Sequence, residues 1–323
     1  MLFLSGCSFF DCSNDSNIRF VPNTERAGVY WWAYWLTSDF SYLNFAARNG
    51  ITEIYLSVPN LRHVNDDGTI PASVMRDVIN PTREFIARAS EKGITVYLLL
   101  GNNGSWLSRN SCEFHRRMNG LRAYQNLVYP HEQFAGLQLN VEPHQLRVLD
   151  GNGQYIHCPT LGRYLRYWDT EAEKPKLVQQ LADFAIMAHD TYGNGNQDPL
   201  ISIDWATTFW WNMHPVTVNG KTMPLSELLI TLSNTIYVMG FRDSAARMVQ
   251  VSGPIINFAQ EKGRTIVLLA SVFADDDGSQ FVEEGRAFMY QQLNLVRGIA
   301  GCSSVHVAIH QIYTWRHWAR CER

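Results

Sequence analysis

The chain has 323 residues, of which 46% are hydrophobic, and a formal net charge of −3. This composition supports a sizeable folded core and excludes a disordered chain. The absence of a basic run argues against a nucleic-acid partner, and no apolar stretch reaches the ~18 residues of a transmembrane helix. Aromatic residues reach 12% and include 10 Trp, a residue suited to packing on flat apolar faces.

The first 25 residues are expected to precede the folded domain. Leu4-Ser5-Gly6-Cys7 resembles a bacterial lipobox, whose cysteine carries a lipid anchor, and the polar segment 11–17 is typical of a tether. Only three residues precede the match, whereas an export signal has a basic region and an apolar core of about 7–15 residues. Two alternatives remain: an exported periplasmic or cell-surface lipoprotein, attached to the membrane only through Cys7, and a cytoplasmic protein.

Six cysteines show neither a CxxC pair nor the spacing of metal ligands. Cys112 with Cys158, and Cys302 with Cys321, are the pairs that an oxidising compartment would allow to bridge. Free buried thiols are equally consistent with the sequence.

Eight apolar runs of strand length recur along the chain, and most are rich in Val, Ile, Leu and Tyr, as strands buried on both faces are. They are residues 28–32, 53–58, 95–100, 136–142, 200–205, 236–241, 265–270 and 305–310.

Helical patterns lie between these runs, at residues 38–48, 72–92, 171–191 and 279–299, with a weaker one at 243–262. Gly253-Pro254 is expected to break or kink this last helix. Strand and helix alternate about eight times without an antiparallel hairpin, which predicts a single (β/α)8 TIM barrel over residues 26–323. The main insertions, 145–169 and 207–224, follow the fourth and fifth strands. A doubly wound open sheet is disfavoured because no Gly-rich phosphate loop follows the first strand.

The fourth predicted strand carries an unusual polar row. Gln138, Asn140 and Glu142 share one face of it, because side chains alternate along a strand, and the opposite face is apolar. Buried polar groups need partners, so a row that ends in a carboxylate just before Pro143 indicates a catalytic shelf. A solvent-exposed strand face is the simpler alternative.

Other strand ends add an acidic, amide-rich and Trp-rich rim, which suits sugar hydroxyls and the apolar faces of sugar rings. We predict a carbohydrate cleft, although core packing is the usual role of any single Trp. The expected substrate-binding residues are Trp32, Trp35, Asn102, Trp106, Gln138, His144, Trp205, Tyr237, Phe241, Arg242, Asp243, His310, Tyr313 and Trp315.

Residues 135–142 resemble the fourth-strand signature of family 18 glycoside hydrolases, the chitinase-like barrels, which reads Asp-Gly-x-Asp-x-Asp-x-Glu. Gly136 and Glu142 match, whereas Ala135, Gln138 and Asn140 stand where that family has aspartates. The segment 237–243 resembles the family's sixth-strand Tyr-x-Met-x-Tyr-Asp, with Phe241 for the second Tyr. Trp315 is placed like the Trp that floors the family's sugar subsite.

The chain is more similar to uncharacterised bacterial barrels that carry Gly-x-x-Leu-Asp-x-Glu-Pro on the fourth strand, Met-x-Tyr-Arg on the sixth and Ile-His-His-Tyr-x-x-Trp on the eighth. The likeness covers most of residues 26–318. Those barrels tend to have a Glu at the end of the seventh strand, where this chain has Ser271-Val272-Phe273.

The resemblance implies a glycoside hydrolase with Glu142 as general acid. Asn140 stands where the family's Asp orients the substrate, but an amide cannot take up a proton, which puts substrate-assisted cleavage in doubt. Glycoside hydrolysis usually needs two carboxyl groups, and Asp204 is the first choice for the second, with Asp243 as the alternative. Asp275–Asp277 are expected to form a solvated loop.

Two rival functions stay open. A non-catalytic, lectin-like barrel would keep the Trp residues and lose the acids. A metal-dependent hydrolase would use His144, His157, His214, His306 or His310, but no HxH or HExxH spacing occurs, so neither metal nor cofactor is expected.

Overall fold

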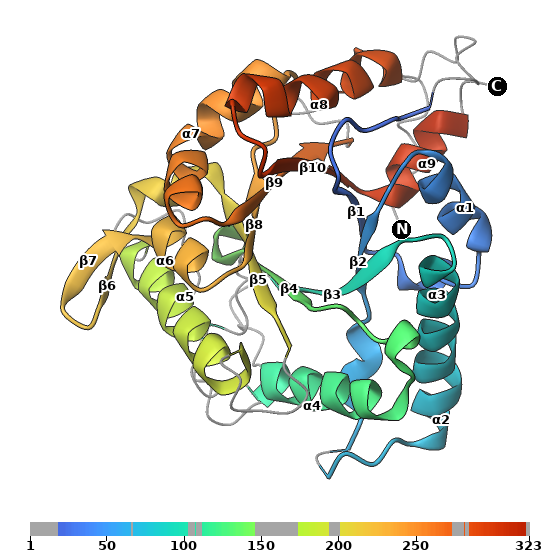
Figure 1. The fold of residues 1–323 in the computed structure, drawn as a ribbon. Coiled ribbons are helices and arrows are strands. Elements are labelled where there is room, and N and C mark those ends of the chain that lie inside the picture. The colour runs from blue at the N-terminus through green and yellow to red at the C-terminus, as the bar shows by residue number, and fades with distance from the viewer. Residues whose placement is uncertain are drawn as a thin grey trace, which may run out of the picture.

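The computed structural model describes residues 19–65, 67–102, 107, 112–145, 174–193, 201–272, 281 and 284–320. Eight parallel strands close a barrel in the order β1-β10-β9-β8-β5-β4-β3-β2 (Figure 1). The predicted (β/α)8 barrel is therefore confirmed, and the open sheet is not formed. The strands are β1 (Ala27–Trp31), β2 (Glu53–Ser57), β3 (Thr95–Asn102), β4 (Leu137–Val141), β5 (Ile203–Thr208), β8 (Thr235–Met239), β9 (Thr265–Ser271) and β10 (Val305–His310).

Helices surround the barrel on its outside (Figure 1). Three of them, α4, α6 and α9, were not predicted. The first has few apolar residues and contains Gly120, α6 is short, and α9 begins two residues after the end of β10. The π-helical turn Met75–Ile79 joins α2 to α3. The helices are α1 (Phe40–Arg48), α2 (Ala72–Val74), α3 (Asn80–Ser90), α4 (Cys112–Leu127), α5 (Lys174–Ala188), α6 (Leu225–Thr231), α7 (Ala245–Glu261), α8 (Arg286–Ala300) and α9 (Ile312–Arg320). None of the described helices is long and apolar enough to cross a membrane.

Of the two effects expected at Gly253-Pro254, the break is wrong, because α7 continues through both residues, and the kink stays a prediction. Proline removes the amide donor for the carbonyl four residues earlier, which is Gln250. Both Pro254 and Gln250 lie on the exposed face of α7, where water can donate the missing hydrogen bond.

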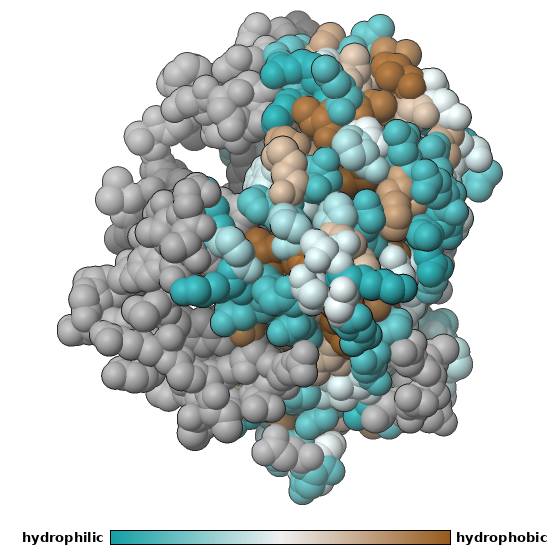
Figure 2. All heavy atoms as spheres, turned by 90° about the vertical axis from the view of Figure 1, so that its left-hand side faces the viewer, coloured by the Kyte–Doolittle hydropathy of each residue, from teal (hydrophilic) through white to brown (hydrophobic). Residues whose placement is uncertain are grey.

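An antiparallel hairpin interrupts the chain between β5 and α6, contrary to the prediction. It consists of β6 (Pro215–Val218) and β7 (Lys221–Pro224), joined by Asn219 and Gly220. Both joining residues have positive φ, at 50° and 75°, as a type I′ turn requires. The Asn-Gly pair was the sequence signal for this hairpin. On this side of the molecule the described surface mixes hydrophilic and hydrophobic residues (Figure 2).

Two apolar cores lie on the two faces of the barrel sheet. The outer core, between strands and helices, takes the strand residues that point outward, such as Val29, Trp31 and Leu139. The inner core fills the barrel and contains Tyr30, Tyr55 and Tyr237, all fully buried. Tyr55 packs in the middle, with its ring centroid 5.0 Å from that of Tyr30 and 4.9 Å from that of Tyr237.

Of the two cysteines that the structure describes, one is in a disulfide and the other is a free thiol. Cys112 forms a disulfide whose partner lies outside the described residues. Cys302 is a free thiol, with Sγ 2.9 Å from Oγ of Ser304, so the bridge to Cys321 does not form. Cys7 and the rest of segment 1–18 lie outside the described residues, as does most of the insertion after β4.

Candidate functional site

The polar row of β4 faces the inside of the barrel. Gln138 is fully buried and Asn140 is 5% exposed, while Leu137 and Leu139 point outward into the outer core. The alternative of a solvent-exposed strand face is therefore wrong. Glu142 follows the last residue of β4 and is half-buried at the C-terminal end of the barrel. We call this end of the barrel the mouth.

The Glu142 carboxylate is held from two sides. Nδ2 of Asn140 donates a hydrogen bond to Oε1 (2.8 Å), and Nε2 of His144 lies 3.3 Å from Oε2. Because a carboxylate only accepts, this contact fixes the Asn140 amide with its nitrogen toward Glu142. The Asn140 Oδ1 atom is buried and has no hydrogen-bond partner within the described part of the chain. It is thus placed to accept a hydrogen bond from a ligand.

Trp32 and His310 meet at the mouth from neighbouring strands. Nε1 of Trp32 donates to Nε2 of His310 at 2.9 Å, so the imidazole acts as an acceptor there. Burial lowers the pKa of His310 to about 4, although the charge of Glu142 opposes this shift, and the imidazole is therefore neutral at pH 7.

Tyr30 lies beneath this pair on β1. Its ring centroid is 5.4 Å from that of His310 and 6.1 Å from that of Trp32. Burial and, secondly, the charge of Glu142 raise the pKa of Tyr30 well above its usual value, which keeps the phenol protonated. Tyr30 was missed in the sequence, although it shares a strand face with Trp32.

Aromatic residues continue the mouth on the β5 and β8 side. The His144 ring lies 5.4 Å from that of Trp210, which belongs to the 3-10 turn Phe209–Met213 after β5. The Arg242 guanidinium stacks 4.6 Å above the Phe209 ring, and its Nη1 donates to the Phe241 carbonyl. The Phe241 ring lies 5.7 Å from the imidazole of His310. The predicted residues Phe241, Arg242 and His144 therefore share this region with Glu142.

Asp243 follows β8 at the same end of the barrel as Glu142. Its Oδ2 pairs with Nη1 of Arg247 at 2.7 Å, and its Oδ1 is buried with no partner among the residues described.

Asp204 is not at the mouth, and the predicted position is wrong. Because β5 runs on to Thr208, Asp204 is the second residue of the strand rather than its end. It pairs in register with Gln138, four residues before Glu142, which puts it roughly 13 Å down the barrel. Its Oδ1 accepts hydrogen bonds from the backbone N–H of Asn234 and of Thr235, both at 2.9 Å.

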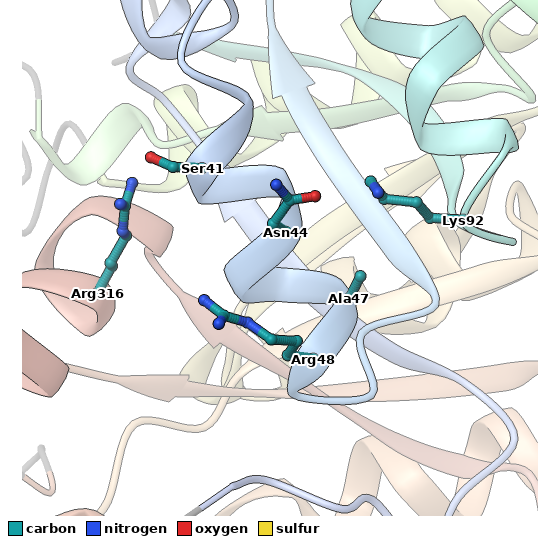
Figure 3. Close-up of a pocket in the computed structure, with 6 residues that line it drawn as sticks. All are labelled: Ser41, Asn44, Ala47, Arg48, Lys92 and Arg316. Atoms are coloured by element: carbon teal, nitrogen blue, oxygen red, sulfur yellow. The ribbon is translucent and has the colours of Figure 1, made fainter. Parts of the chain in front are cut away.

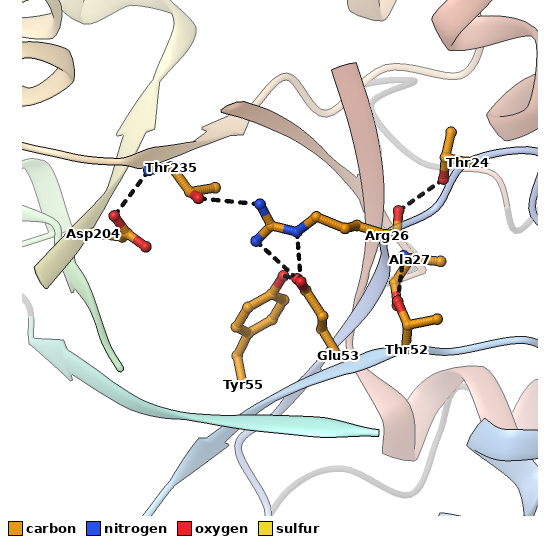
Figure 4. A network of polar contacts seen from close by, with 8 residues as sticks. All are labelled: Thr24, Arg26, Ala27, Thr52, Glu53, Tyr55, Asp204 and Thr235. Carbon is orange, nitrogen blue, oxygen red and sulfur yellow. Dashed lines mark hydrogen bonds and ion pairs between the residues drawn. The ribbon is translucent and has the colours of Figure 1, made fainter. Parts of the chain in front are cut away.

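A polar network closes this opposite end, which we call the base (Figure 4). Arg26 forms two hydrogen bonds with the Glu53 carboxylate and a third with the Thr235 hydroxyl, and Tyr55 donates to Glu53. Burial raises the pKa of Asp204 to about 6, despite the two backbone donors and Arg26. These groups link β1, β2, β5 and β8 to one another, so their role is structural.

Four other predicted binding residues lie away from the mouth. Trp205 points into the outer core, where its ring centroid is 5.9 Å from that of Phe184. Trp315 is fully buried on α9, and its Nε1 donates to the Tyr290 hydroxyl at 2.8 Å, so it floors no sugar subsite. Tyr313 stacks on Tyr42 outside the barrel. The remaining one, Tyr237, is buried in the middle of the barrel.

Trp35 is 75% exposed on the short turn that follows β1. Trp106, His157, Asp275–Asp277 and the side chain of Asn102 lie outside the described residues, so their predicted roles stay predictions. No group of three His, Cys, Asp or Glu that could hold a metal ion occurs within the ranges that the structure describes.

A separate cavity of about 380 Å³ lies outside the barrel (Figure 3). It is lined by α1, α9 and the turn after α3, and three of its residues, Arg48, Lys92 and Arg316, are basic. Arg316 is buried, stacks 3.8 Å from the Tyr42 ring and pairs with Asp39 at 3.7 Å. This cavity shares no lining residue with the mouth.

No protein-family model matches the chain, and no curated protein matches its sequence. A fungal β-1,4-galactanase structure is 13% identical, with a TM-score of 0.53 over 89% of each chain. A chitinase from Bacteroides thetaiotaomicron is 13% identical over 90% of each chain (TM-score 0.48). An endo-β-N-acetylglucosaminidase from Cordyceps militaris is 10% identical, over 100% of this chain and 97% of that one (TM-score 0.46). The match to the galactanase confirms the expected likeness to glycoside hydrolase barrels at the level of the fold.

Proposed function

We propose that this protein is a glycoside hydrolase in which Glu142 is the general acid. The observation that carries the proposal is the position of Glu142: it ends the inward-facing polar row of β4 and is held by Asn140 and His144. Active sites of (β/α)8 barrels lie at this end, and a positioned carboxylic acid is what protonates a glycosidic oxygen. The fold shared with the galactanase agrees with this assignment.

Each neighbour of Glu142 has a role in this proposal. Asn140 fixes one carboxylate oxygen, while His144 contacts the other, so the acid is orientated before substrate binds. In the reaction, the protonated Glu142 donates its proton to the leaving-group oxygen. Asn140 cannot exchange protons, and it serves as a positioning residue.

A second carboxylate is needed for the usual two-carboxylate mechanism, and we assign Asp243 to this role. Asp204 is at the base, whereas Asp243 follows β8 at the same end as Glu142. Since β5 alone separates β4 from β8, the two residues follow strands that are two spacings of about 4.8 Å apart.

The test is a reducing-end release assay on a panel of polysaccharides and peptidoglycan fragments. We expect release by the wild type, and a loss of roughly 10²- to 10⁴-fold in Glu142→Gln, since a general acid contributes about this much. Glu84→Gln is the matched control, because Glu84 is on the exposed side of α3 and pairs with Arg88. Turnover by Glu142→Gln at the wild-type rate would reject the assignment, and full activity of Asp243→Asn would reject the second carboxylate.

A carbohydrate-binding barrel without hydrolytic activity is the second candidate. The polar row of β4 favours this function, because Gln138 and Asn140, which share its face with Glu142, carry amides and not carboxylates. If no polymer is cleaved, but the wild type and Glu142→Gln bind the same polymer equally, this second function replaces the first.

A further inference from the structure

Trp32 directly follows β1 at the mouth, packs against the inner core and is neither fully buried nor part of the outer core. We infer that this residue, Trp32, is the platform on which a sugar ring stacks, held flat by Gly101 at one edge and by His310 at the other. The inference rests on the proposed function, because it names the group that would bind the substrate ring beside Glu142.

Gly101 gives the indole its place over β3. A Cβ atom added at Gly101 would lie 2.3 Å from Cη2 and 2.6 Å from Cζ3 of Trp32. These distances are far below van der Waals contact, so the benzo edge of the indole lies directly on the Gly101 backbone. Any side chain at position 101 would displace the indole from this position.

His310 holds the opposite edge of the same ring from β10. The indole N–H donates to its Nε2, and a neutral imidazole is the form that accepts this hydrogen bond. The ring of Trp32 thus spans from β10 to β3 across the mouth. Tyr30 supports it from within the barrel, as the inner-core contact of 6.1 Å between the rings shows.

The other described tryptophans near the mouth do not offer this arrangement. Trp31 and Trp211 are fully buried in the outer core, as is Trp315, to which the family resemblance assigned the platform. Trp210, beside His144, is half-buried but packs against the outer core. Trp32 is half-buried, which leaves part of the indole open to a ligand. The fixed ring also costs a ligand little ordering entropy, since both of its edges are already held.

The platform is placed to put a sugar ring next to Glu142. The carboxylate is close enough to shift the pKa values of both Tyr30 and His310, two of the residues that contact Trp32. The Asn140 Oδ1 atom, which lacks a partner in the described part of the chain, can then accept a sugar hydroxyl. A sugar ring stacked on Trp32 would therefore lie beside one hydrogen-bond acceptor, Asn140 Oδ1, and one acid, Glu142.

The test measures binding and not hydrolysis, in a Glu142→Gln background that leaves the probe intact. Isothermal titration uses soluble hexasaccharides of β-1,4-linked glucose, xylose, galactose and N-acetylglucosamine. The hexasaccharide that this background binds most tightly is then titrated into each variant. We expect Trp32→Ala to weaken its binding roughly 10- to 100-fold. Gly101→Ala should weaken it to a similar extent, although it removes no group from the mouth.

The histidine variants separate positioning from folding. His310→Gln keeps a hydrogen-bond acceptor for the indole N–H and should therefore retain most of the affinity. His310→Leu removes this acceptor and should weaken binding to the extent that Gly101→Ala does. Circular dichroism should show that both histidine variants are folded. Unchanged affinity in Trp32→Ala, or no binding of any hexasaccharide at millimolar concentration, would overturn the platform. Trp32-dependent binding without release of reducing ends by the wild type would reject the hydrolase alone.

Discussion

Replacing Asp204 by asparagine should remove a large pH dependence from the stability of the barrel. The folded chain holds the pKa of Asp204 at about 6, compared with its usual 3.8, mainly because the carboxyl is buried at the base. The protonated form is therefore favoured by folding. This stabilisation is complete below about pH 3.8 and is lost as the pH rises through 6. A pKa that is about 2 higher in the folded chain corresponds to about 3 kcal/mol.

The measurement is the free energy of unfolding in urea, from pH 4 to pH 8, for the wild type and Asp204→Asn. Asparagine keeps the oxygen that accepts from the backbone of Asn234 and Thr235 but has no charge to bury. We expect the two proteins to be similar at pH 4, and the variant to gain up to about 3 kcal/mol over the wild type by pH 7.5. Asp77→Asn is the control, since Asp77 is exposed and its pKa is lowered rather than raised.

A difference between the two proteins that stays constant from pH 4 to pH 8 would refute this reasoning. A variant that becomes less stable than the wild type at the higher pH would also refute it, because the ionised carboxylate would then be the favoured form.

Three further predictions concern the packing and the mouth. Gly120→Ala should lower the free energy of unfolding in urea by about 1–3 kcal/mol or more, because the added Cβ would lie 2.1 Å from the Leu61 carbonyl oxygen. Gly298→Ala is the control and should lower it little, because there is open space around Gly298. Trp315→Phe should destabilise the fold by about 1–3 kcal/mol through its lost hydrogen bond, with no change in glycan binding; weaker binding would contradict its placement. The ring resonances of His310 should titrate near pH 4 in NMR, and a midpoint near 6.5 would contradict a buried neutral imidazole.

Most of the barrel can be predicted from the sequence because its strands are buried on both faces. Apolar, β-branched runs then stand out from the amphipathic helices, and the run at 305–310 coincides with β10. The helices α4 and α6 escape the same reasoning. The first is largely polar and is packed through one close contact at Gly120, and the second is only seven residues long.

The errors in the site come from small errors in the elements. The fifth strand was predicted at 200–205 but runs from Ile203 to Thr208, because Thr207 and Thr208 are buried despite being polar. Because the predicted strand ended three residues too early, Asp204 was assigned to the mouth, although it lies at the base. Trp315 was misplaced for a related reason: no helix was predicted after β10, although the spacing of Ile312, Trp315 and Trp318 already indicates one face of a helix.

The row on β4 was placed correctly because period-two alternation is independent of strand ends. Glu142 could therefore be assigned to the mouth from sequence alone. The platform could not be predicted, since Trp32 and Gly101 are 69 positions apart in the sequence and their contact leaves no local pattern.

The tyrosines that fill the middle of the barrel separate its two ends. The Tyr55 hydroxyl donates to the Glu53 carboxylate of the base, while the Tyr30 ring packs against the imidazole of His310 on the other side. The rings of these two tyrosines pack against each other, with their planes inclined by 52°, and lie between the two polar regions. We therefore expect a change of charge in the mouth to leave the Arg26–Glu53 ion pair of the base undisturbed. Such a division leaves the chemistry of the mouth free to change during evolution while the framework beneath it stays the same.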